Sequence, residues 1–191
     1  MKYLVIYAHP NPQSLNGHLR EIIVKLLEDR GHEVRIRDLY HLKFNPVLSL
    51  EDMEGQRRGQ VCVEVKTEQD FITWADCLLV IHPIWWTGLP AILKGYIDRV
   101  FSYGFAYQYK QGVQKGLLNG KQIVVINTHG KSKKEYQDIG MDQALVLTSD
   151  RGIYAYSGLE ITHHFFFDQA DSAKDETIED WKSQIKGAFL L

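Results

Sequence analysis

The sequence predicts an α/β fold in which a doubly wound parallel sheet of five strands carries helices on both faces. Short β-branched and aromatic runs alternate with amphipathic helical stretches along the chain, and this alternation is typical of parallel βαβ units. The 191 residues are 45% apolar, which is enough to bury one full core. No repeat or linker interrupts the pattern, so we expect a single domain over residues 1–191.

Each element follows from its local pattern. Strands are predicted where apolar residues run together between polar loops, as in a sheet covered on both faces: 2–8, 32–39, 77–83, 121–128 and 159–167. Helices are predicted where apolar residues recur on one stripe, as Leu19, Ile23 and Leu27 do in the first. The predicted helices are 16–31, 64–76, 90–101 and 174–190. The stretch from Tyr40 to about Gly59 is expected to be an irregular excursion.

Composition excludes several classes of function. The net charge is −2, so no basic field attracts nucleic acid or an anionic membrane. Cys62 and Cys77 lack metal spacing. His163 and His164 are adjacent on a predicted strand and would point to opposite faces, without carboxylate or thiolate partners, so no metal site is expected. With no membrane-length apolar run and no signal-peptide pattern, we expect a cytoplasmic protein.

Three loops follow strands at the edge where such sheets bind ligands, beyond the carboxyl ends of the strands. In the first loop, "HPNPQSLNG", polar side chains and free N–H groups at a helix N-terminus would suit an anion such as phosphate. Ordinary helix capping by Ser14 or Asn16 explains the same residues. The loop has neither GxGxxG nor a Walker-type lysine motif, which weakens the ordinary Rossmann and P-loop interpretations.

The second loop, "HPIWWTGLP", places two indoles between prolines. Gly88 permits close approach, and Trp86 offers a flat surface beside exposed amides, which would suit a planar heteroaromatic ring. Alternatively, Trp85 and Trp86 pack into the core or a dimer contact. The third loop, from Asn127 to Tyr136, adds small and polar residues. Together the three loops predict a flavin mononucleotide (FMN) pocket.

Three sequence blocks carry a family resemblance: "PIWWTGLPAILKGYIDRVF", then "YGFAYQY", and "WAD" before the third strand. With these blocks the chain resembles the flavodoxin-like NAD(P)H:quinone oxidoreductases, including bacterial general-stress and potassium-efflux ancillary members. The resemblance runs from the first strand to the last helix and implies a flavodoxin-like fold.

The resemblance also implies a role for each matching residue. Tyr107 and Tyr109 would enter the pocket of a partner subunit and contact the substrate, so a homodimer with shared active sites is expected. Tyr136 would act at the flavin. The cofactor-binding residues would be His9, Ser14, Leu15 and Asn16 at the ribityl-phosphate arm, Pro83, Ile84, Trp85 and Trp86 at the isoalloxazine ring, and Thr128, His129, Gly130 and Tyr136 at its pyrimidine side.

Two departures from the family pattern affect this side of the ring. Many relatives have Thr-Gly-Gly where this chain has Thr128-His129-Gly130, so His129 would either lie above the ring or point to solvent. Longer relatives follow the tyrosine with a histidine proposed as proton donor. Here Tyr136 is followed by Asp138 and Asp142 instead, which puts the route of proton delivery in doubt.

The implied reaction is a two-electron, ping-pong transfer of hydride from NAD(P)H to the flavin and then to a quinone or similar acceptor. FMN is favoured over FAD because relatives that hold FAD use extra chain at the C-terminus. Two other functions stay open: a flavoprotein regulatory subunit of a membrane potassium-efflux transporter, and a flavodoxin-type electron carrier. Carriers are usually strongly acidic, whereas this chain is nearly neutral.

Overall fold

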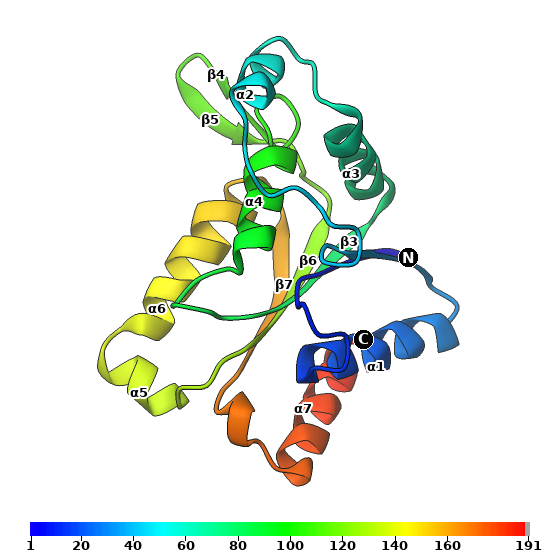
Figure 1. Ribbon diagram of the computed structural model, residues 1–191, viewed down its shortest axis with the longest axis vertical. Coiled ribbons are helices and arrows are strands. Elements are labelled where there is room, and N and C mark those ends of the chain that lie inside the picture. The colour runs from blue at the N-terminus through cyan, green and yellow to red at the C-terminus, as the bar shows by residue number, and fades with distance from the viewer. Residues whose placement is uncertain (190–191) are drawn as a thin grey trace.

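A computed structural model describes residues 1–189 and confirms the predicted α/β architecture, a doubly wound parallel sheet with helices on both faces (Figure 1). Its main sheet has five parallel strands in the order β2-β1-β3-β6-β7. These strands are β1 (Lys2–Tyr7), β2 (Glu33–Asp38), β3 (Cys77–Pro83), β6 (Gln122–Thr128) and β7 (Glu160–Phe167). The strand order reverses direction between β1 and β3, which is the position where doubly wound sheets bind ligands.

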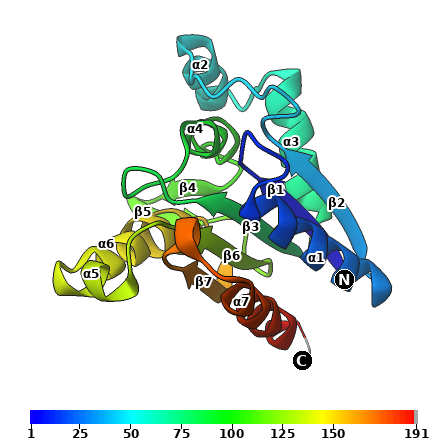
Figure 2. The same cartoon turned by 60° about the horizontal axis from the view of Figure 1, so that its bottom comes forward.

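Helices cover both faces of the sheet (Figure 2). On one face lie α1 (Leu15–Asp29) and α7 (Asp175–Ala188), and on the other lie α3 (Val63–Trp74), α4 (Ala91–Val100) and the π-helical η1 (Leu147–Ala155). Strand β1 shows why both faces need helices to cover them. Leu4 and Ile6 belong to the hydrophobic core on one face, whereas Val5 and Tyr7 belong to the core on the other. Successive side chains of a strand alternate between faces, so an apolar run feeds two cores.

The excursion after β2 contains a helix that the sequence pattern did not predict. Helix α2 (Leu50–Arg57) has no buried residue, so it has no apolar stripe to reveal it. It begins with a capping box between Ser49 and Asp52. The buried Arg99 of α4 anchors it, with Nε 3.0 Å from the Asp52 carboxylate and Nη1 2.7 Å from the Asn45 carbonyl oxygen.

In two further segments the structure has elements that the sequence pattern does not predict. The chain after α4 forms a two-stranded antiparallel hairpin of β4 (Tyr107–Lys110) and β5 (Val113–Gly116). The long connection between β6 and β7 is helical, with α5 (Lys133–Asp138) and α6 (Met141–Val146) preceding η1, and a short 3₁₀ turn η2 (Ala170–Ser172) follows β7. None of the helices within residues 1–189 has the length and apolar character needed to cross a membrane.

Candidate functional site

The three loops expected to form the site meet at the carboxyl edge of the sheet. Asn16, at the start of α1, donates from Nδ2 to the Thr128 Oγ1 at the end of β6 (2.8 Å). The backbone N–H of Ile84 donates to the Thr128 carbonyl oxygen (2.8 Å). The rings of His9 and Trp85 lie 5.7 Å apart, centroid to centroid. Residues far apart in the sequence are therefore brought together as predicted from the ends of their strands.

The first loop ends in an ordinary helix cap. The Ser14 hydroxyl accepts from the N–H of Gly17 (3.2 Å) and contacts the Tyr7 hydroxyl (3.2 Å). Capping thus accounts for Ser14, but it does not account for Leu15 and Asn16, whose N–H groups find no acceptor within residues 1–189. The Asn16 side chain is buried, and its Oδ1 has no partner among the described atoms. Free donors at a helix N-terminus suit an anion.

The second loop is a strained tight turn. Trp86 and Thr87 have φ values of 49° and 55°, in the left-handed region that costs energy for a bulky or β-branched residue. This backbone leaves Trp86 fully exposed and Trp85 40% exposed. Packing of the two indoles into the core of their own chain is therefore excluded. A dimer contact stays open for both.

The third loop buries its histidine. His129 is 5% exposed and its ring stacks on Tyr136, with centroids 4.7 Å apart and planes at 8°. Of the two orientations considered for His129, the one pointing to solvent is wrong. Burial lowers the pKa of His129, which favours the neutral imidazole. Its Nδ1 has no hydrogen-bond partner among the described side chains.

The two aspartates that follow Tyr136 differ in their surroundings. Asp138 pairs with the exposed Lys134 (2.8 Å) and faces outward. Asp142 faces inward, where its Oδ1 is buried without a partner among residues 1–189. Asp142 also lines a cavity together with Tyr136 and His129. A carboxyl group is therefore available on the inner side of the third loop, although the family's histidine is absent.

Tyr107 and Tyr109 lie far from these loops. They belong to the β4–β5 hairpin, which stands at the opposite end of the sheet from α5 (Figure 1). Their rings are neighbours, 6.4 Å apart, and the Tyr109 hydroxyl is 3.1 Å from that of Tyr156. This hydrogen bond and partial burial raise the pKa of Tyr156 to about 12. The fold of a single chain does not bring Tyr107 or Tyr109 to its own candidate site.

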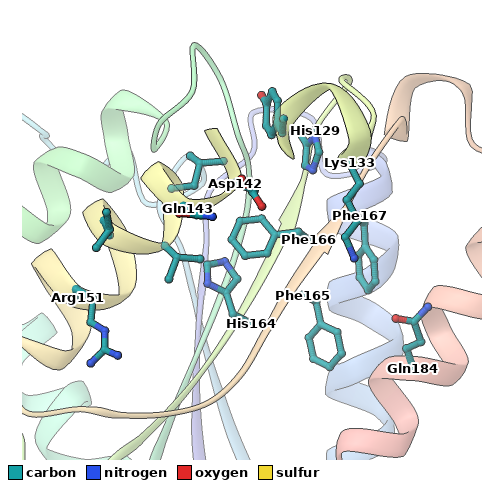
Figure 3. A pocket seen from close by; sticks show the side chains of 14 residues that line it. His129, Lys133, Asp142, Gln143, Arg151, His164, Phe165, Phe166, Phe167 and Gln184 are labelled. Atoms are coloured by element: carbon teal, nitrogen blue, oxygen red, sulfur yellow. The ribbon is translucent and has the colours of Figure 1, made fainter. Parts of the chain in front are cut away.

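One cavity of the described chain is distinct from the space between the three loops, although it reaches the third loop. It has a volume of about 650 Å³ and runs along the edge strand β7, past Phe165, Phe166 and Arg151 (Figure 3). Of the predicted site residues, only His129 and Tyr136 line it. We place the candidate site at the loops, because their contacts join residues from three strand ends at the switch point of the sheet.

A second cavity, of about 370 Å³, lies directly under the Trp86 turn. Its lining includes Ile84, Gly88, His82 and Asn127. The sequence places His82 and Asn127 at the start of the second and third loops but predicts no role for either, because each is the penultimate residue of an apolar strand. The sequence-based prediction was wrong about the surroundings of His164, because the Asp150 carboxylate lies 2.8 Å from its Nδ1. Within residues 1–189, no group of three or more His, Cys, Asp or Glu side chains could hold a metal ion.

Comparison with known proteins identifies the family. Residues 1–187 match the family described as having a flavodoxin-like fold, and the chain belongs to that family. It is 39% identical over 199 residues to an uncharacterized NAD(P)H oxidoreductase of Haemophilus influenzae, covering 100% of this chain and 98% of that protein. It is 30% identical over 158 residues to the human ribosyldihydronicotinamide dehydrogenase [quinone], covering 74% of this chain and 68% of that one. The resemblance stated from the sequence is confirmed.

Solved structures of similar proteins share the whole fold. Smu.1420 from Streptococcus mutans UA159 is 33% identical and superimposes with a TM-score of 0.86, covering 98% of this chain and 97% of that chain. The NAD(P)H:quinone oxidoreductase from Methanothermobacter marburgensis is 25% identical with a TM-score of 0.87, covering 98% and 96% of the two chains.

Proposed function

We propose that this protein is an FMN-dependent NAD(P)H oxidoreductase of the quinone-reducing type. The observation that carries the proposal is the meeting of three loops at the switch point of the sheet, under the exposed indole of Trp86. The names of the relatives support the same class of enzyme, since they include an NAD(P)H oxidoreductase and quinone dehydrogenases. When bound, the FMN supplies the redox chemistry, a two-electron, ping-pong exchange between NAD(P)H and a quinone.

The first loop fits the ribityl-phosphate arm of FMN. The free N–H groups of Leu15 and Asn16 lie at the positive end of the α1 dipole, where a phosphate binds well. The unpartnered Oδ1 of Asn16 would accept a hydrogen bond from a ribityl hydroxyl. His9 and Ser14 border the same end of the helix. The donor set therefore fits the charged and hydroxylated end of the cofactor.

The second and third loops fit the isoalloxazine ring. Pro83, Ile84 and Trp85 would line one face, with Trp86 at its edge. Thr128, Gly130 and Tyr136 would border the pyrimidine side. Donors at this side stabilise the negative charge that develops on reduction. His129, neutral and stacked on Tyr136, would fix the orientation of that tyrosine, and the Asp142 carboxyl would hold or deliver a proton nearby.

Tyr107 and Tyr109 would act in a homodimer. Since both lie at the far end of their own sheet, only a second copy of the chain could bring them to the flavin. In an isologous dimer each hairpin would cover the site of its partner, so two shared active sites form together. The tyrosines would then orient nicotinamide and quinone by contact, and exclude water from the ring.

The two alternatives have less support. No feature of the site favours a regulatory subunit of a potassium-efflux transporter, and the names of the relatives above do not describe one. A flavodoxin-type carrier exchanges electrons with other proteins, whereas the relatives named above are an NAD(P)H oxidoreductase and a quinone dehydrogenase. FMN is the flavin proposed here, and reconstitution with each flavin distinguishes it from FAD.

Reconstitution tests the cofactor assignment directly. Protein incubated with excess FMN and desalted is expected to retain about one FMN per subunit, since a doubly wound sheet has one switch-point crevice. A parallel incubation with FAD, followed by release and chromatography, separates the two flavins. A colourless product in both incubations would end the proposal.

A further inference from the structure

A chain of buried polar side chains lies beneath the candidate site and crosses three strands. The Asp150 carboxylate of η1 contacts His164 Nδ1 on β7 (2.8 Å), and His164 Nε2 contacts Asn127 Oδ1 on β6 (2.6 Å). Asn127 Nδ2 contacts His82 Nε2 on β3 (2.9 Å). His82 Nδ1 then contacts the carbonyl oxygen of Pro83 (2.9 Å). All four side chains are nearly or completely buried.

The direction of each hydrogen bond follows from the last contact. A carbonyl oxygen only accepts, so His82 Nδ1 must carry a proton and donate to Pro83. Complete burial lowers the pKa of His82 to about 4, so the ring is neutral and its Nε2 accepts. Asn127 therefore donates from Nδ2 and accepts at Oδ1, and His164 must donate from Nε2.

At the other end of this hydrogen-bond network, the contact between His164 and Asp150 requires one more proton. With Nε2 of His164 already protonated, a neutral ring would turn the Nδ1 lone pair toward the Asp150 carboxylate, lone pair against lone pair. A proton between them removes this repulsion. Both ring nitrogens of His164 then donate, and the Asp150 carboxylate accepts from Nδ1 in a charge-assisted hydrogen bond. Ser149 also donates to the same carboxylate oxygen of Asp150 (2.9 Å).

The hydrogen-bond network ends at the peptide unit between Pro83 and Ile84, which belongs to the proposed flavin site. The carbonyl of Pro83 accepts from His82, and the N–H of Ile84 in the same peptide donates to Thr128 (2.8 Å). Both ends of this peptide are therefore held, immediately before the strained turn at Trp86 and Thr87. Rotation of this peptide would move every backbone amide of the loop.

We propose that Asp150, His164, Asn127 and His82 act as a positioning network, in which His164 donates from both ring nitrogens and so orders the hydrogen bonds that hold the Pro83–Ile84 peptide against the flavin. The flavin part rests on the proposed function. The four residues touch neither cofactor nor substrate in this account, so they are positioning residues. Other titratable groups near the network are Tyr154 on η1, whose pKa is raised by burial and by Asp150, and Asp142 and Arg151, which line the cavity beside His164.

The arrangement of protons is testable without any flavin. In protein labelled with ¹⁵N-histidine at pH 7, ring nitrogen shifts should show His82 as a neutral ring protonated on Nδ1 and His164 as a ring protonated on both nitrogens. Spectra of His82→Gln and His164→Gln assign the signals. A proton on Nε2 of His82, or a single ring proton on His164, would contradict this assignment of donors and acceptors.

The positioning role has a matched control on the same strand. His164→Gln keeps a donor toward Asn127 but removes the donor toward Asp150, whereas His163→Gln makes the same substitution on the other face of the strand, where His163 stacks on Phe165. In flavin-free protein, His164→Gln should shift the Ile84 amide resonance, and His163→Gln should not. FMN binding should weaken about tenfold in His164→Gln, as expected for loss of one buried, charge-assisted hydrogen bond.

Two outcomes are decisive for the role. If Ile84 and the affinity for FMN respond equally to both substitutions, the network only supports the fold, and the positioning role is wrong. If His164→Gln does not fold, Asp150→Asn replaces it, with one ring proton expected on His164 and the same shift at Ile84. A wild-type protein that binds no FMN would refute the proposed function, while the Ile84 amide would still decide whether the network positions the peptide.

Discussion

Trp85 and Gly88 exchange two backbone hydrogen bonds of 3.1 Å each, N–H of one to carbonyl oxygen of the other. This pairing closes a two-residue turn that holds Trp86 and Thr87 in the left-handed region. Turns of this kind normally use asparagine and glycine. Because a Trp-Thr pair has no such preference, the strain must be offset by the surrounding loop, and strain of this kind is concentrated at functional sites.

Removal of the Trp86 indole should affect flavin and not the fold. Trp86 is fully exposed, whereas Trp181 on α7 is buried and stacks on Phe167 at 4.8 Å. We expect Trp86→Ala to weaken FMN retention and change the flavin fluorescence, with little change in the melting temperature. Trp181→Ala should lower stability by about 3–5 kcal/mol, as for other buried aromatic residues. Equal effects of the two substitutions on bound flavin would argue against Trp86 at the ring.

Relief of the turn strain should stabilise the protein. Glycine adopts the backbone of Thr87 without a steric penalty, so Thr87→Gly should raise the free energy of unfolding by roughly 1 kcal/mol. Thr73→Gly, near the end of helix α3, is the control in the opposite direction and should lower the free energy of unfolding by about 0.5 kcal/mol or less. Denaturant titration measures both. If Thr87→Gly destabilises the protein as Thr73→Gly does, the left-handed turn is not a source of strain.

Tyr107→Ala tests the shared site. We expect turnover with quinones to fall about tenfold through loss of substrate orientation, with FMN still bound. Mixing this variant with one defective in FMN binding, such as Asn16→Asp, gives a heterodimer. Its flavin-competent pocket receives Tyr107 from the other subunit, so activity should partly return. If subunits exchange and activity does not return, Tyr107 does not act across an interface.

Stability should fall in mild acid because of His82. Burial, and to a lesser extent His164, lower the folded-state pKa of His82 to about 4, whereas an unfolded histidine titrates near about 6.5. At a pH between these two pKa values, His82 is protonated in the unfolded chain but neutral in the folded protein. Neutral His82 thus contributes stability above about pH 6.5 that is lost as the pH falls toward about 4.

The substitution His82→Gln isolates that contribution. Wild-type protein should take up about one proton more on unfolding than this variant does between pH 4 and 6.5, by the linkage between stability and pH. Urea midpoints of both proteins at pH 8, where His82 is neutral in the folded and unfolded states, measure any loss of stability that does not depend on pH. Identical pH slopes for the two proteins would show that His82 is not a buried neutral ring.

Local patterns were enough to predict the sheet. Strand β1 alternates Leu4 and Ile6 with Val5 and Tyr7 between two cores, and Gly31 ends the first helix with a φ of 75°. The helices that escaped prediction lack such a pattern. Helix α2 buries no residue, and η1 is π-helical over Leu147–Ala155, so its side chains do not recur with the period of an α-helix.

Sheet topology allowed part of the candidate site, the meeting of its loops, to be predicted from the sequence. Loops after parallel strands meet at one edge, so the neighbourhood of Asn16, Ile84 and Thr128 follows from topology alone. The contact between Asp150 and His164 does not, because it depends on how η1 packs against β7. Nor does the left-handed turn at Trp86, since its residues carry no local preference for that backbone.

Anaerobic titration of the FMN-loaded protein with NADH or NADPH tests the central claim most directly. The account predicts that the visible flavin absorbance bleaches on addition of at least one of the two donors, and that a small quinone then restores it with one quinone consumed per flavin. Absorbance that stays unchanged with both donors, in protein that holds FMN, would contradict the assignment as an NAD(P)H oxidoreductase.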